Sequence, residues 1–169
     1  MGSTLTVDNI VGATSSSAIK IPGHVVQVVQ YHRRGQQDGT AVSNLAVVTT
    51  DSFSDVMSKA ITTEFANSLI HVKMTIVIYE NTGAALRSKI KILRNTTEID
   101  ADVYGGYHPA GSLMQTKSYE FIDTPSAAAG TALTYKLQAA ETGGSSACWG
   151  YGDSGGGGSA SIVLTEIAQ

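Results

Sequence analysis

A serine in a glycine-rich segment is the first residue of this sequence that could do chemistry. Residues 152–156 read Gly-Asp-Ser-Gly-Gly, which places Ser154 where a hydrolase could hold its nucleophile. A serine hydroxyl attacks a carbonyl only when a histidine accepts its proton and an acidic residue orients that histidine. The sequence contains four histidines, so the surroundings of each decide whether this chemistry is available.

These surroundings do not match a serine protease. The same five letters surround the nucleophile of chymotrypsin-like proteases, but no histidine here stands in that family's Ala-Ala-His-Cys setting. Fifteen residues, 155–169, follow Ser154, and we expect them to be too few for the specificity pocket and terminal helix of that fold. Because a motif without its structural context is weak evidence, we expect no catalytic residue. The histidines are His24, His32, His71 and His108.

Two segments that combine glycine with aromatic residues are better candidates for binding than for catalysis. One is Tyr104–Pro109 (YGGYHP), and the other is 143–158, which contains eight glycines. Glycine beside an aromatic residue lets the ring lie flat and exposed, as in proteins that stack on sugars. The alternative is that both segments are loops whose rings fold back onto the domain. The candidate receptor contacts are Tyr104, Tyr107, His108, Trp149 and Tyr151.

Composition narrows the class of protein further. Apolar residues make up 42% of the chain and charged residues only 15%, so the domain is folded and its surface is rich in hydroxyl groups. The net charge of −3 gives no attraction to nucleic acid, and no apolar run approaches the ~20 residues of a membrane span. With Cys148 as the single cysteine, an intrachain disulfide and a cysteine-rich zinc site are excluded. We expect no metal and no cofactor.

The elements that must position these residues are all strands. In Leu69–Glu80 the alternate residues Ile70, Val72, Met74, Ile76 and Ile78 share one face, which is the period of a strand against a core. No segment longer than about ten residues has the pattern of a helix. Strands joined by loops predict an all-β, jelly-roll-like antiparallel β-sandwich. The expected strands are His24–Tyr31, Ala46–Thr50, Ser58–Phe65, Leu69–Glu80, Ser88–Arg94, Thr97–Val103, Leu113–Ile122, Ala132–Ala140 and Ser161–Ala168.

Residues 1–23 differ from the rest and are expected to form an extended leader ahead of a sandwich domain at 24–169. The leader is interrupted by the spacer GATSSS and closed by Pro22-Gly23, which is a turn signal. It therefore has little to offer a core and is suited to docking on another protein. The candidate docking residues are Leu5, Val7, Ile10, Ile19 and Ile21.

The first and last strands are apolar on both faces. In His24–Tyr31 the expected alternation puts Val25 and Val29 on one face and Val26 and Val28 on the other. A strand of this kind needs cover on both sides, either from a loop or from another subunit. The second interpretation predicts an oligomer interface. Its candidate residues are Val26, Val28, Val163 and Ile167.

Several stretches resemble structural proteins of marine bacteriophages of the cyanophage and pelagiphage type. The leader segments Ser3–Thr14 and Ile19–Gln30, the turn Tyr119–Pro125 and the strand Leu133–Gln138 are similar to a terminal β-sandwich module of tail-fibre type. The ending Leu164–Ala168 is similar as well. The resemblance covers about half of the chain.

The resemblance implies a non-enzymatic virion protein, made in the cytoplasm of the host bacterium and released by lysis. It implies a homotrimer that attaches through its leader to other virion proteins of the tail or capsid. Its distal loops would contact a host-surface glycan. A capsid decoration, head-fibre or cement protein is the alternative, and a tailspike-like enzyme that degrades glycans is a remote one. Such an enzyme would need two converging carboxylates, and the sequence offers no recognisable pair.

Overall fold

The structure, a computed structural model, describes residues 21–33, 36–37, 40–41, 46–48, 51–82, 86–108, 111–142, 146–149 and 159–169. These residues form strands, turns and extended connections, with no helix among them. The strands are β1 Val25–Arg33, β2 Gln36–Gln37, β3 Thr40–Ala41, β4 Ala46–Val48, β5 Ser54–Thr62, β6 Leu69–Thr82, β7 Leu86–Arg94, β8 Thr97–His108, β9 Gly111–Asp123, β10 Ala132–Thr142, β11 Ser146–Trp149 and β12 Ala160–Ile167.

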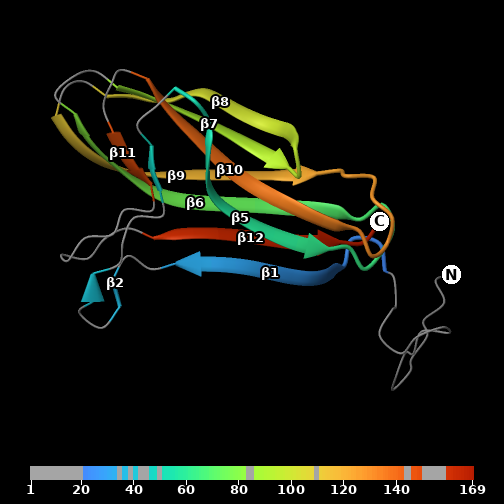
Figure 1. Ribbon diagram of the computed structural model, residues 1–169. Coiled ribbons are helices and arrows are strands. Elements are labelled where there is room, and N and C mark those ends of the chain that lie inside the picture. The colour runs from blue at the N-terminus through green and yellow to red at the C-terminus, as the bar shows by residue number, and fades with distance from the viewer. Residues whose placement is uncertain are drawn as a thin grey trace, which may run out of the picture.

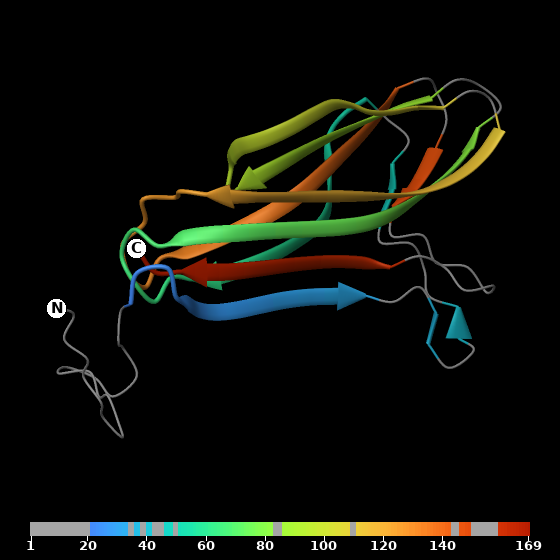
Figure 2. The same cartoon turned by 180° about the vertical axis from the view of Figure 1, so that it is seen from behind.

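Two antiparallel sheets face each other across the core (Figures 1 and 2). The first sheet has the order β1-β12-β6-β9. Past the end of β12, the short strand β11 pairs with the same edge of β6, and β4 pairs with β11. The second sheet has the order β5-β10-β7-β8. When the eight long strands are counted along the chain, these orders are 1-8-3-6 and 2-7-4-5. This is the strand order of a jelly roll, so the predicted fold class is confirmed.

The nine strands expected from the sequence are all present, with shifted ends. β8 ends later than expected, at His108 instead of Val103. β5 was expected at Ser58–Phe65 and instead runs from Ser54 to Thr62. It ends early because the Thr63 hydroxyl donates to the carbonyl oxygen of Ala128 (2.7 Å) and Asn67 takes a left-handed φ of 60° in the turn that follows. The strands β2, β3 and β11 were not expected.

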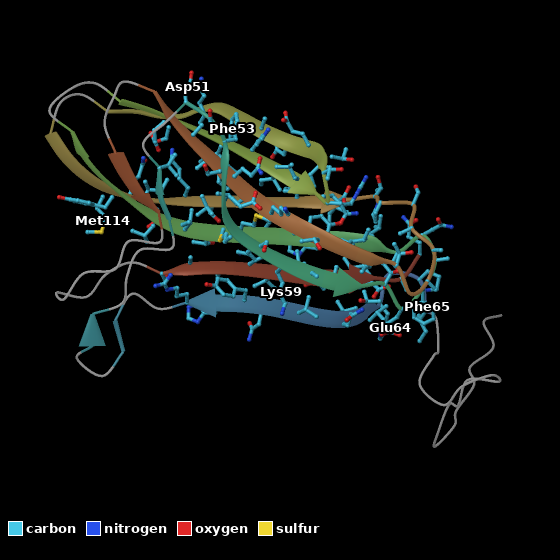
Figure 3. The ribbon with its side chains drawn as sticks, viewed as in Figure 1. Asp51, Phe53, Lys59, Glu64, Phe65 and Met114 are labelled. Atoms are coloured by element: carbon cyan, nitrogen blue, oxygen red, sulfur yellow. The ribbon has the colours of Figure 1, made fainter. Side chains whose placement is uncertain are left out.

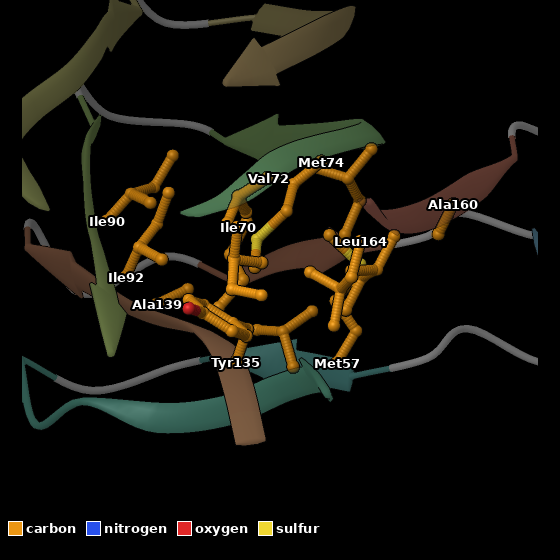
Figure 4. Packing of buried hydrophobic residues seen from close by; sticks show 14 of the residues in the cluster. Met57, Ile70, Val72, Met74, Ile90, Ile92, Tyr135, Ala139, Ala160 and Leu164 are labelled. Carbon is orange, nitrogen blue, oxygen red and sulfur yellow. The ribbon is translucent and has the colours of Figure 1, made fainter. Parts of the chain in front are cut away.

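The core lies between the sheets and follows the predicted alternation (Figure 4). All five even-numbered apolar residues of β6 are completely buried, and on β10 the same holds for Tyr135 and Leu137. Each large side chain removed from water contributes ~1.5–3 kcal/mol to folding, so these two central strands supply much of the driving force.

Asp123 links the two sheets at one end of the sandwich. The Nη1 atom of Arg94 on β7 donates to both oxygens of Asp123 on β9 (2.6 and 2.7 Å), and the Tyr135 hydroxyl on β10 donates to Oδ2 (2.6 Å). Burial of the ring, followed by the hydrogen bond to the Asp123 carboxylate, raises the pKa of Tyr135 far above its ordinary value. The neutral hydroxyl is therefore favoured, and it is this form that donates to Asp123.

Candidate functional site

The jelly roll has two ends with different contents. At one end the turns between β5 and β6, β7 and β8, and β9 and β10 lie beside residue 21 and the C-terminus (Figures 1 and 2). We call this the leader end. The opposite end holds the C-terminal ends of β6 and β8. There the last residues of β6 pair with β9 and β11, and the last residues of β8 pair with β7. We call this the distal end.

Three of the five candidate receptor contacts lie in β8, which corrects the expectation that Tyr104–Pro109 is a loop. Tyr107 pairs with Arg87 and His108 with Leu86, so both belong to the second sheet at the distal end. Tyr104 lies where the register with β7 is irregular, between the pairs Ser88–Gly106 and Ile90–Asp102. The two glycines after Tyr104 thus accompany a bulge inside a strand.

Trp149 also lies in a strand and not in a loop. It is the last residue of β11, where it pairs with Ile78 of β6 and with Ala46 of β4 in the first sheet. Trp149 and His108 therefore belong to different sheets at the same end of the sandwich. Tyr151 and Ser154 lie outside the described residues. Four of the five leader candidates do so too: Leu5, Val7, Ile10 and Ile19.

The remaining leader candidate, Ile21, is 45% exposed and begins the predicted turn. The carbonyl oxygen of Ile21 accepts a hydrogen bond from the amide of His24 (3.0 Å), and Gly23 has a φ of 83° that favours glycine. The Gly23 amide donates to the carbonyl oxygen of Ala168 (2.7 Å). The chain at residue 21 is thereby held against the C-terminal strand at the leader end.

A buried carboxylate, Glu166 on β12, organises the leader end. Its Oε2 accepts a hydrogen bond from Nε2 of Gln27 on β1 (2.7 Å). The backbone amides of Glu64 and Phe65, in the turn after β5, donate to the same carboxylate at 3.0–3.1 Å. Glu64 and Phe65 are visible in this turn in Figure 3. Glu166 has no exposed surface, and it joins the first strand, the last strand and the β5–β6 turn.

The protonation of Glu166 follows from these contacts. Burial by itself raises the pKa of a carboxyl group, but the hydrogen bonds from Gln27, the two backbone amides and the Ser68 hydroxyl outweigh it. The pKa of Glu166 consequently lies below its ordinary value. The carboxylate is ionised at neutral pH and is compensated there by neutral donors, which points to a structural role.

Three of the four candidate interface residues lie on the outer face of the first sheet, namely Val28, Val163 and Ile167, and Val26 lies at the bulge between Val25 and Gln27. Val28 is 56% exposed, whereas Val26, Val163 and Ile167 are half-buried. The expected grouping of Val25 with Val29 is wrong, because the pairing of β1 with β12 shifts register between Val25 and Gln27. Val29 packs against the core, but Val25 pairs with Ile167 and is 54% exposed. The bulge turns Val25 to the outer face.

Sequence reasoning missed Glu166, Asp123 and the exposed Ile122. A signal for Glu166 was present, since it continues the alternation Ala160, Ile162, Leu164 that defines the core face of β12. A carboxylate in that phase predicts a buried polar contact. Within the described ranges, no group of three His, Cys, Asp or Glu side chains is placed to hold a metal ion, and no helix is long and apolar enough to cross a membrane.

Comparisons with known proteins support the fold. No protein-family model and no curated protein matches the chain. Among solved structures, dimeric latent PorU from Porphyromonas gingivalis superposes with a TM-score of 0.51 at 8% identity, over 93% of this chain and 14% of that one. At this identity the likeness concerns the fold alone.

Two structures from infectious bursal disease virus superpose less well. The VP2 subviral particle gives a TM-score of 0.48 at 10% identity, over 99% of this chain and 37% of that one. The structure of the Gx strain gives 0.38 at 12% identity, over 100% of this chain and 43% of that one. The chain thus spans less than half the length of each of these three proteins.

Proposed function

We propose that this protein is a non-enzymatic structural component of a bacteriophage virion, assembled as a homotrimer. Residues 1–23 attach it to the particle, and the distal end contacts a host-surface glycan in the manner of a tail fibre. The observation that carries the proposal is the polarity of the jelly roll. Residue 21 is held at the leader end, whereas Tyr107, His108 and Trp149 lie at the opposite end.

This polarity suits display. A rigid sandwich that is fixed at one end presents its other end away from the particle, and binding residues on rigid strands lose little conformational entropy when they engage a ligand. Jelly rolls serve both in viral capsids and in lectins, which gives the fold a precedent for each half of the role by analogy. The sequence segments of the leader and of Tyr119–Pro125 that resemble phage structural proteins support the same assignment.

Attachment is tested with a chain that begins at Ile21, which keeps the turn to His24 and the hydrogen bond from Gly23 to Ala168. We expect it to melt within a few degrees of the full chain and to lose co-sedimentation with purified particles of the phage that encodes it. Retained co-sedimentation would exclude the leader as the attachment segment. Labelling of the bound protein by electron microscopy then separates a tail position from the capsid position of a decoration protein.

Glycan contact is tested by Trp149→Ala and Tyr107→Ala in a binding assay on host cells and extracted surface polysaccharide. The matched control is Phe53→Ala, because Phe53 is an exposed ring (37%) in a different setting, with the Lys91 ammonium 4.3 Å from its centre. We expect at least a tenfold loss of binding from either distal variant and none from the control. If all three variants bind as well as wild type, the distal residues do not contact a receptor. The protein would then only attach to the particle, as a cement protein does.

A further inference from the structure

The exposed apolar side chains of the molecule are concentrated on one surface. Of the six large hydrophobic residues that are exposed in the described part of the chain, four lie on the outer face of the first sheet: Val25, Val28, Met114 and Ile122. The outer face of the second sheet instead carries Lys89 with Asp51, Lys91 with Glu98, and Lys136 with Asp55. Exposed apolar groups that gather on one face distinguish a candidate protein interface from ordinary solvated surface.

The exposed apolar groups lie on the two marginal strands of this face, β1 and β9, and a charged cluster is formed by His71 and Lys73 on β6 with Glu120 on β9. Val28 lies on β1 at one margin and is 56% exposed, and Ile122 lies on β9 at the other and is 51% exposed. The Glu120 carboxylate binds the ammonium of Lys73 (3.1 Å) and Nε2 of His71 (3.0 Å) within the same copy. Because the Lys73 ammonium and the Glu120 carboxylate are paired within one copy, the cluster brings opposite charges in balance to a neighbouring copy.

The strand register places the two margins at equal height. Val28 pairs with Thr165, Thr165 with His71, and His71 with Ile122, so these residues form one row across the sheet. If copies of the chain are related by rotation about an axis parallel to the strands, they are not displaced from one another along the strand direction. In a closed ring, one copy's Val28 therefore meets Ile122 of the next copy directly.

The next row along the strands is complementary as well. Gln30 pairs with Val163, Val163 with Lys73, and Lys73 with Glu120. A neighbouring copy would bring the exposed amide of Gln30 to the Glu120 carboxylate, whose side chain is 50% exposed. The β1 margin thus offers Val28 and the donor Gln30, and the β9 margin offers Ile122 and the acceptor Glu120 at the same heights.

The width of the face fits three copies. Four strands at ~4.8 Å spacing make a face about 19 Å wide, and three such faces enclose a triangle whose sides lie about 5.5 Å from its centre. Sheets that pack face to face are ~10 Å apart, so the side chains of each reach about 5 Å, which is enough to fill this space. With ten residues at ~3.4 Å, the face of each copy measures on the order of 600 Å² and is shared between two neighbours. Each contact between two copies therefore buries on the order of 600 Å² in total, about half of a small standard interface, and the closed ring buries about three times that area.

We propose that the outer face of the first sheet is the trimer interface, and that the β1 margin of one copy contacts the β9 margin of the next around an axis parallel to the strands. The inference rests on the self-association in the proposed function and specifies its surface. It also has a functional consequence. Rotation about this axis keeps the three leader ends together on one side and the three distal ends on the other.

The test is the mass of the full-length chain and of charge variants by light scattering. Wild type should have three times the monomer mass, and Val28→Glu and Ile122→Arg should each reduce the mass threefold. The double variant, with Val28→Glu and Ile122→Arg in one chain, should restore the trimer because every contact then joins opposite charges. Ser58→Glu, on an exposed position of β5 in the second sheet, is the control and should remain trimeric. Unchanged melting temperatures check the fold.

Each result separates the alternatives. Trimeric single variants would place the interface elsewhere and leave the proposed trimer intact. Monomeric single variants with a monomeric double variant would refute the pairing of Val28 with Ile122, because a contact of Val28 with itself predicts that outcome. A monomeric wild type would refute the trimer itself, while attachment through the leader would still be decided by co-sedimentation.

Discussion

Glu166 and Asp123 both join elements that are distant in the sequence, but they are compensated differently. Asp123 is paired with the Arg94 guanidinium and the Tyr135 hydroxyl, so positive charge balances it. Glu166 is more deeply buried and receives only neutral donors, namely the Gln27 side-chain amide, two backbone amides and the Ser68 hydroxyl. The first carboxylate fastens sheet to sheet, and the second fastens β1 and the β5–β6 turn to β12.

The difference shows what each site requires. Backbone amides in a turn have fixed positions and would be costly to bury without an acceptor. An anion satisfies them better than a neutral group does, because hydrogen bonds to charged groups are stronger. Around Asp123, by contrast, the cation is the group that needs a partner. Replacing each carboxylate should therefore have consequences of different size.

The largest effect is expected for Glu166→Ala. The substitution leaves the amides of Glu64 and Phe65 without their acceptor and opens a small cavity in the core. Gln27 Nε2 loses one of its two acceptors and keeps the Thr62 carbonyl oxygen (2.6 Å). Each stranded donor costs ~1–3 kcal/mol, so we expect the free energy of unfolding to fall by about 3–5 kcal/mol. Urea unfolding measures it. A loss below about 1 kcal/mol would mean that water replaces the carboxylate.

A second, smaller effect is expected for Asp123→Asn. The side chains of Arg94 and Asp123 are 22% and 11% exposed, so this pair is shielded from solvent but not fully buried. We expect a loss of about 2 kcal/mol because the guanidinium keeps its desolvation and loses its anion. A double-mutant cycle with Arg94→Met isolates the pair, and a coupling energy near zero would show that the bidentate contact contributes nothing.

Some of this arrangement could be predicted from the sequence and some could not. The alternation in β6 predicted its five buried residues because each strand has one face against the core. The bulge at Val25 and the early end of β5 escaped prediction because they depend on partners far along the chain. The Thr63 hydroxyl, for example, donates to Ala128, 65 residues away.

The candidate receptor contacts show the same division. Aromatic residues beside glycines were recognisable in the sequence, but Tyr104 to His108 belong to β8 and Trp149 belongs to β11. Pairing with β7 and β6 overrides the local preference of glycine for turns. The row that aligns Val28 with Ile122 exists only through two intervening strands, so no local pattern could reveal it.

Acid provides a third test of the comparison. The folded-state pKa of Glu166 lies below the unfolded value of ~4.3, so the unfolded chain binds more protons in this range. The stabilisation is fully present above pH ~4.3 and is lost as the pH falls through the folded-state pKa. Unfolding measured from pH 6 to pH 3 should show stability decreasing with acid, and Glu166→Gln should reduce this slope relative to wild type. An equal slope in both proteins would assign the acid response to other carboxylates.

The smallest effect is expected on the outer face of the second sheet, at Asp55 with Lys136. The Lys136 ammonium lies 3.0 Å from Oδ2 of Asp55, and Nε2 of Gln138 donates to Oδ1. Hydrogen bonds from Gln138 and then Lys136 lower the pKa of Asp55. The carboxylate is half exposed, however, so water and salt screen the pair and leave ~0–1 kcal/mol. Asp55→Asn should reduce the free energy of unfolding by at most about 0.5 kcal/mol and should leave the mass of the proposed trimer unchanged. A loss comparable to that of Asp123→Asn would mean that charge pairs on this open face are as well shielded as the link between the sheets, and the distinction between solvated and buried carboxylates would fail.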